Sequence, residues 1–152
     1  MAFPRDLHDE LDATFRSSPL LEANGIELVA WLPGSATVRM TPTEAHGNLA
    51  GSVNGAALFA LADAAFEVAC NSYGRVCLAL ETSCHYRKPA AIGDALTAAA
   101  SEVARGTKTG SYRIDLRSSD GDLVAWYMAL AYRTDRWHLG EDRWPEAWRS
   151  SH

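Results

Sequence analysis

The chain has 152 residues, of which 47% are hydrophobic and 22% charged, and its formal net charge at pH 7 is −5. This length suits a single globular domain with a core of its own. The acidic balance argues against a nucleic-acid-binding protein, which needs a basic surface to meet phosphates. A few local basic residues would still suffice to bind a small ligand that carries phosphate.

The first ten residues are polar and acidic, and no apolar run is long enough to span a membrane. Three cysteines, Cys70, Cys77 and Cys84, form no C-x-x-C pair. Their odd number and their spacing predict free, buried thiols rather than a disulfide framework or zinc ligands. We therefore expect a cytoplasmic protein without a targeting segment, a membrane contact or a metal.

The N-terminal part of the chain predicts a helix followed by a hairpin. Residues 5–16 carry apolar side chains at helical spacing with acidic residues between them, which is typical of an amphipathic helix. Two short runs, 26–31 and 37–40, read as strands on either side of a Pro33-Gly34 turn.

A polar, glycine-containing loop over residues 42–53 leads into a long helix from about Gly55 to about Ser72. Asn54 is a suitable N-cap for this helix, and Gly74 is a suitable stop after it. Because the helix is apolar on nearly all sides, it is expected to be buried.

The second half of the chain predicts four strands, separated by turn residues. These strands are 76–86, 95–103, 111–117 and 123–132. The layout of hairpin, buried helix and antiparallel meander predicts an α+β fold in which a curved antiparallel sheet wraps one helix. We expect a single domain over residues 1–134 and a tail rich in Trp and Arg over 135–152, with its indoles packed on this domain or on a neighbouring subunit.

Two carboxylates stand out in the long helix. Asp63 and Glu67 are the only charged residues between Ala56 and Cys70, and a spacing of four places them on one face. Carboxylates on an apolar helix are paired, exposed or functional, so this face reaches solvent, a subunit interface or a catalytic site. Their mutual repulsion is expected to raise the pKa of one of them.

The loop before the helix provides the second feature. Unpaired N–H groups at a helix start can polarise a carbonyl oxygen or hold an anion. Gly55 and Ala56 are small enough to let a ligand approach that backbone closely.

Together these residues resemble a known family. The pattern Asn48-x-x-Gly51-x-x-Asn54-Gly55-Ala56, followed by Asp63, is similar to the N-x-x-G-x-x-H-G-G signature and later acidic residue of the PaaI-like (phenylacetyl-CoA-type) hotdog thioesterases. The resemblance spans about residues 20–134. Further matching segments are 66–72, 86–90, 93–94 and 121–125.

The resemblance implies a hotdog fold, hydrolysis of an acyl-CoA thioester, and two subunits that pair their sheets. It implies that Asp63 is the nucleophile or the general base that activates water, that Asn48 orients water or substrate, and that the Gly55 N–H polarises the thioester carbonyl. No cofactor is needed, because coenzyme A arrives as part of the substrate. We expect a homodimer and, since the family often pairs dimers, a homotetramer.

The chain departs from the family at four positions, which are expected to shape the substrate site. Asn54 replaces the family His, Ala56 replaces the second Gly, Ala79 replaces a hydroxyl residue, and Glu67 replaces a small residue. His46, close to Asn48 in sequence, is a further candidate for the substrate site. Candidate partners for the phosphates of coenzyme A are Arg87, Lys88, Arg105 and Lys108.

Helix geometry adds an argument that needs no family. Gly55 and Asp63 are eight residues apart, which is about 12 Å along one helix at 1.5 Å per residue. One thioester cannot contact both, so a site that uses both needs two chains. Two alternatives stay open: a module that binds acyl-CoA without cleaving it, and a hydratase or dehydratase in which His46 would take the place of the missing loop His. The acyl group is also open.

Overall fold

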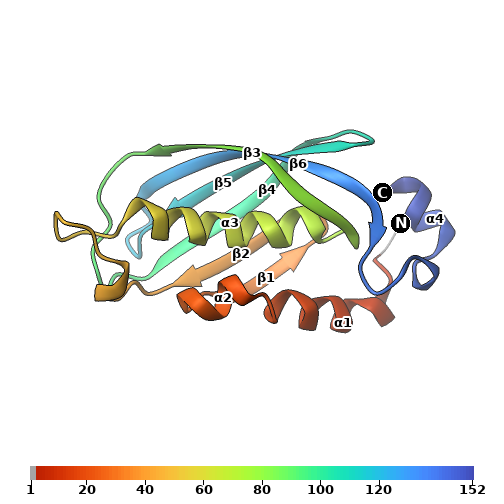
Figure 1. Cartoon of the computed structure of the whole chain (residues 1–152), viewed down its shortest axis with the longest axis horizontal. Coiled ribbons are helices and arrows are strands. Elements are labelled where there is room, and N and C mark those ends of the chain that lie inside the picture. The colour runs from red at the N-terminus through yellow and green to blue at the C-terminus, as the bar shows by residue number, and fades with distance from the viewer. Residues whose placement is uncertain (1–2) are drawn as a thin grey trace.

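The computed structural model describes residues 3–152, which form six β-strands and four α-helices. A curved antiparallel sheet wraps around the central helix α3, and the remaining helices lie at the margins of the sheet (Figure 1). The expected architecture is therefore confirmed. The strands are β1 (Glu27–Leu32), β2 (Ser35–Met40), β3 (Arg75–Tyr86), β4 (Leu96–Arg105), β5 (Thr109–Arg117) and β6 (Leu123–Trp137). The helices are α1 (Arg5–Arg16), α2 (Pro19–Asn24), α3 (Gly55–Asn71) and α4 (Glu146–Ser151).

The start of α3 is fixed by the residue before it. The Asn54 side-chain oxygen accepts a hydrogen bond from the Ala56 N–H at 2.8 Å, as an N-cap does. Helix α3 then packs its alanines and larger apolar residues against β2, β4, β3 and β5. Gly74 follows with φ +87°, a left-handed conformation that ends the helical run and favours glycine.

The strand order corrects one expectation from the sequence. The sheet runs β1-β2-β4-β5-β6-β3, so only β4, β5 and β6 form a meander, whereas β3 pairs with β6 at the far edge. The connection from β3 to β4 contains Pro89 and is too long for a tight hairpin, so it carries the chain across the sheet. Strand β4 instead pairs with β2.

The C-terminal tail folds back onto its own domain. Trp144 and Trp148 are each only 2% exposed. Their indole N–H groups donate to the backbone carbonyls of His138 at 2.7 Å and Tyr73 at 2.9 Å. Strand β6 continues to Trp137, and the division of the chain at residue 134 stays a prediction.

The cysteines agree only partly with expectation. All three are free, and Cys70 and Cys77 are buried, but Cys84 is exposed because it lies on the edge strand β3. The prediction of a buried thiol was wrong at this position. Among residues 3–152, the structure contains no helix long and apolar enough to cross a membrane.

Candidate active site

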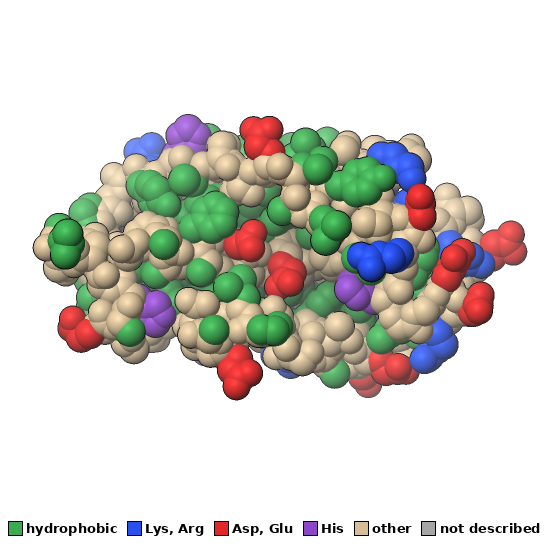
Figure 2. All heavy atoms as spheres, viewed as in Figure 1, with side chains coloured by type: hydrophobic (Ala, Val, Ile, Leu, Met, Phe, Trp, Pro, Cys, Tyr) green, Lys and Arg blue, Asp and Glu red, His purple; other side chains and the backbone are tan. Residues whose placement is uncertain are grey.

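The two carboxylates of α3 border a cavity of about 420 Å³. Asp63 is half-buried and Glu67 is exposed, and Figure 2 shows acidic side chains over α3 among mainly hydrophobic ones. The wall opposite α3 comes from the first part of β3, including Ala79, and from the α1–α2 junction. The cavity therefore combines an apolar lining with carboxylates at its edge, a composition suited to an acyl chain next to a reacting group.

The environment of Asp63 favours a reactive carboxylate. No donor among the described residues forms a hydrogen bond with its oxygens. Burial raises the pKa of the Asp63 carboxyl, and the negative charge of Glu67 raises this pKa further. The expected rise in the pKa of one carboxyl is therefore confirmed for Asp63. Glu67 accepts a hydrogen bond from the Ser18 hydroxyl at 2.9 Å, which ties α3 to the start of α2.

The N-terminus of α3 presents a free backbone donor. No described residue accepts a hydrogen bond from the Gly55 N–H, whereas the Gly55 carbonyl accepts one from the Tyr86 hydroxyl at 3.0 Å. A Cβ atom at position 55 would lie 3.1 Å from the Tyr86 ring. The absence of a side chain thus keeps the approach to this N–H open between the helix and the end of β3.

The side chain of Asn48 forms hydrogen bonds within its own loop. Its side-chain oxygen accepts from the N–H groups of Ala50 at 2.9 Å and Ser52 at 3.1 Å. Its amide nitrogen donates to the Ser52 hydroxyl at 2.9 Å. These bonds shape the loop that delivers Gly55, and Asn48 and Gly55 line the same depression.

Asp63 and Gly55 do not share a depression within one chain. Asp63 lies in the cavity beside Ala79, whereas Gly55 lies beside Tyr86 and Arg87 near the other end of β3. This arrangement agrees with the helix spacing derived from the sequence.

The remaining candidate residues for substrate binding also lie in two different depressions. Ala79 and Glu67 share the cavity of Asp63, but His46, Asn54 and Ala56 line a shallow depression at the loop. The His46 ring nitrogen Nδ1 accepts from the Thr43 N–H at 3.0 Å and caps a short 3₁₀ turn, Glu44–His46. In a single chain, His46 therefore has a local structural role away from Asp63.

The four basic candidates for coenzyme A divide between the two ends of β3. Arg87 and Lys88 border the depression of Gly55, and Lys88 forms an ion pair with Asp122. Arg105 and Lys108 lie near the start of β3, where Lys108 pairs with Asp135 at 2.8 Å. One chain cannot bring both pairs to the same ligand.

Sequence reasoning missed several residues that shape the cavity. Asn71 links the walls of the cavity. The side-chain oxygen of Asn71 accepts a hydrogen bond from the Cys77 N–H at 2.9 Å and lies 2.8 Å from the His138 ring nitrogen Nε2. Ser18 anchors Glu67 from outside the helix. The polar Asn71 at the end of an apolar helix was a signal in the sequence, whereas nothing near His138 indicated this contact.

Comparison with known proteins identifies the family to which this chain belongs. The model of the thioesterase superfamily matches residues 50–125. Acyl-coenzyme A thioesterase PaaI of Escherichia coli is 33% identical over 129 residues, which cover 85% of this chain and 92% of that protein. The chain belongs to the thioesterase superfamily, and the predicted resemblance to PaaI-like proteins is confirmed.

Solved structures confirm the hotdog fold. The Escherichia coli PaaI structure superposes with a TM-score of 0.84 at 30% identity and covers 91% of this chain and 100% of that one. A single-residue variant of the phenylacetic acid degradation protein PaaI from Thermus thermophilus superposes with a TM-score of 0.74 at 34% identity, covering 77% and 100% of the two chains.

Proposed function

We propose that this chain hydrolyses an acyl-coenzyme A thioester in a homodimer, with Asp63 of one subunit and the Gly55 N–H of the other acting on the same bond. The observation that carries the proposal is the half-buried Asp63 carboxylate, which has a raised pKa and no hydrogen-bond donor among the described residues, at the edge of an apolar cavity. Such a carboxylate can accept a proton or attack a carbonyl carbon. The related PaaI of Escherichia coli is named as an acyl-coenzyme A thioesterase.

The chemistry needs only these two groups. As a general base, Asp63 takes a proton from water while the water oxygen attacks the thioester carbon. As a nucleophile, Asp63 attacks that carbon itself, and water then hydrolyses the resulting anhydride. In both routes the developing oxyanion accepts a hydrogen bond from the Gly55 N–H, and the sulfur leaves as a thiolate that takes up a proton.

The free edge of β3 supports the dimer. This twelve-residue strand pairs only with β6 among the described strands, and its Leu78 and Leu80 side chains are 53% and 57% exposed. A long edge with exposed apolar residues favours pairing with another strand. A two-fold axis would join two copies of this edge in antiparallel fashion.

The positions of the two groups along β3 suggest the register of this pairing. Ala79 shares the cavity of Asp63, whereas Tyr86 contacts Gly55. If Ala79 of one chain lies opposite Tyr86 of the other, with the two-fold axis between Thr82 and Ser83, Asp63 approaches the Gly55 N–H of the second chain. The same arrangement occurs twice in the dimer, so we expect two equivalent sites.

The test is the release of free thiol from a panel of aryl- and fatty-acyl-CoA esters, with Asp63→Asn compared with wild type. Asparagine keeps the size of the side chain but removes its basicity, so kcat should fall by about 10²- to 10⁴-fold. Asp120→Asn, in an exposed turn, is the matched control and should retain full activity. An Asp63→Asn protein that folds and turns over at the wild-type rate would refute the role of Asp63.

A non-catalytic acyl-CoA-binding module is the second candidate. It is favoured by Asn54 at the position of the family His, because an amide cannot exchange protons near neutral pH. Its signature in the same experiment is a wild-type protein that binds acyl-CoA esters yet releases no thiol from any of them.

A further inference from the structure

The cavity beside Asp63 continues along α3 to the end of the helix, where Asn71 and His138 complete its lining. Asp63 and Asn71 are eight residues apart, which corresponds to about 12 Å along the helix. His138 follows the end of β6 and lies beyond residues 50–125, which match the thioesterase model. The far end of the cavity is therefore formed in part by a segment outside the matched region.

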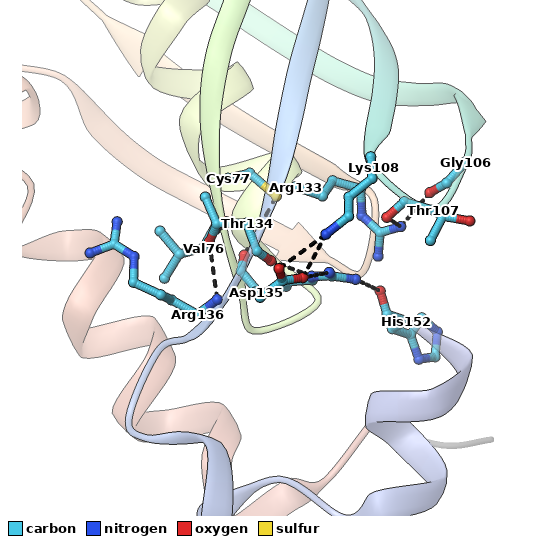
Figure 3. A network of polar contacts seen from close by, with 11 residues as sticks. Val76, Cys77, Gly106, Thr107, Lys108, Arg133, Thr134, Asp135, Arg136 and His152 are labelled. Atoms are coloured by element: carbon cyan, nitrogen blue, oxygen red, sulfur yellow. Dashed lines mark hydrogen bonds and ion pairs between the residues drawn. The ribbon is translucent and has the colours of Figure 1, made fainter.

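Contacts on both sides hold His138 at this end of the cavity. The backbone N–H of His138 donates to the Gly74 carbonyl at 2.8 Å, and the His138 carbonyl accepts from the Trp144 indole at 2.7 Å. The strand that leads to His138 is tied to the start of β3 (Figure 3), because the Thr134 hydroxyl donates to the Val76 carbonyl at 2.7 Å. The imidazole is thus positioned by the fold itself.

The hydrogen bonds of Asn71 determine the tautomer of the His138 ring. The Asn71 amide nitrogen donates to the Glu67 backbone carbonyl at 2.9 Å, which identifies the other amide atom as the oxygen. This oxygen accepts from the Cys77 N–H and lies 2.8 Å from the Nε2 of His138. Because an amide oxygen only accepts, Nε2 carries the proton and Nδ1 has a lone pair. Burial lowers the pKa of the His138 imidazole and the positive charge of Arg136 lowers it further, so the ring is neutral near neutral pH.

The Nδ1 lone pair of His138 is available to a ligand. Within residues 3–152, this nitrogen has no hydrogen-bond partner and is not one of the enclosed side-chain atoms that lack a partner. His138 is half-buried and forms part of the cavity wall. A ligand that satisfies Nδ1 must bring a hydrogen-bond donor.

The other polar side chains of the cavity also use their hydrogens within the protein. The hydroxyl groups of Thr14, Ser17 and Ser18 donate to protein oxygens at 2.9, 2.8 and 2.9 Å, respectively. Asp63 and Glu67 carry carboxyl groups, which only accept when they are ionised. These side chains therefore offer a ligand lone pairs rather than hydrogens.

We propose that this cavity selects a medium-length acyl chain with a terminal hydroxyl group, which donates to Nδ1 of His138. The proposal rests on the thioesterase function proposed above. An extended chain of about eight carbons, followed by one hydrogen bond, covers the roughly 12 Å from Asp63 to this end of the cavity. The lone pairs and carboxylates of the lining disfavour an acyl chain that ends in a carboxylate, and the charge of Arg136 disfavours one that ends in an ammonium group.

The test is thiol release from 8-hydroxyoctanoyl-, octanoyl- and 8-methoxyoctanoyl-CoA, which differ at the end of the chain. The methoxy group keeps the oxygen but has no hydrogen to donate. Wild type should prefer the hydroxyl ester to both others by about five- to tenfold in kcat/KM, which is the contribution of one hydrogen bond. Octanedioyl-CoA, which ends in a carboxylate, should be the poorest substrate.

His138→Phe removes the acceptor and keeps an aromatic ring at this position. Its preference for the hydroxyl ester should disappear, whereas a general loss of structure would lower kcat/KM for all esters alike. His8→Phe is the matched control, because His8 is exposed, stacks on Trp31 and lies outside the cavity; it should keep the wild-type preference. Circular dichroism checks that both variants fold.

Equal kcat/KM of wild type for the hydroxyl and methoxy esters would overturn the proposal, and so would a folded His138→Phe protein that keeps the wild-type preference. The comparison of esters on wild type decides alone if His138→Phe does not fold. If wild type releases no thiol from any ester, the thioesterase proposal fails. The same preference is then measured as a ratio of dissociation constants by calorimetric titration, so the two failures are seen separately.

Discussion

Replacing Gly55 with proline would remove the backbone donor on which the proposed mechanism depends. Gly55 is the first residue of α3, where the N–H has no partner within the helix and where proline is well tolerated. Asn54 already has φ −66° and ψ 140°, the extended conformation that a residue before proline requires. The variant therefore deletes one N–H and keeps the start of the helix.

Gly55→Ala is the control that isolates this N–H. The new Cβ atom of either variant would lie about 3.1 Å from the Tyr86 ring, so both impose a similar small displacement on Tyr86. Only proline also removes the donor, because its Cδ takes the place of the amide hydrogen. One oxyanion donor contributes about 3 kcal/mol to transition-state stabilisation, and this corresponds to about a 150-fold difference in kcat between the two variants.

The assay is steady-state thiol release at saturating acyl-CoA, with circular dichroism to confirm folding. We expect kcat of Gly55→Pro to fall far below that of Gly55→Ala while KM changes little, because the lost hydrogen bond strengthens only as the oxyanion forms. A Gly55→Pro protein within a few-fold of Gly55→Ala would show that this N–H does not stabilise the oxyanion.

Two further predictions concern Asp63: the effect of Glu67 on its pKa, and the sharing of a site between Asp63 and Gly55 of two subunits. Glu67→Gln removes a charge that raises the pKa of Asp63, so Asp63 should ionise at lower pH and the acidic limb of the kcat/KM profile should move to lower pH; a limb that stays in place would separate Glu67 from the reacting group. Mixing inactive Asp63→Asn with inactive Gly55→Pro should restore about a quarter of wild-type activity, since about half of the dimers become mixed and each regains one of two sites. Mixed dimers that form, as native mass spectrometry would show, but stay inactive would rule out a site shared between subunits.

The sequence predicted those elements that are specified locally. The helix over 5–16 and the start of the long helix at Gly55 agree with α1 and α3, because apolar spacing and an N-cap act within a few residues. The position of β3 at the far edge was not predictable in this way. The neighbour of a strand is determined by contacts across the whole sheet. The link through Pro89 indicates only that the next strand does not form a tight hairpin with β3.

The candidate site shows the same contrast. Asp63 was identifiable because a charge on an apolar helix is conspicuous in any sequence, and the structure places it beside a cavity. His138 was not identifiable, since it follows the last predicted strand and nothing near it in the sequence indicates a role. Its place beside the cavity depends on the fold, which brings it within 2.8 Å of Asn71, 67 residues earlier in the chain.

The length of β3 links the site to the quaternary structure. Twelve residues of extended strand span about 40 Å at 3.3 Å per residue, and the acyl cavity and the Gly55 donor lie at different points along that length. A single subunit therefore has the Asp63 carboxylate without a nearby Gly55 N–H at one point, and the Gly55 N–H without a nearby carboxylate at another. In the proposed dimer, a two-fold axis across the free edge would combine both incomplete halves into complete sites without any new residue. If this is how the enzyme works, a charge such as Leu80→Asp on the free edge of β3 should abolish turnover by separating the subunits, even though every proposed catalytic residue remains in place.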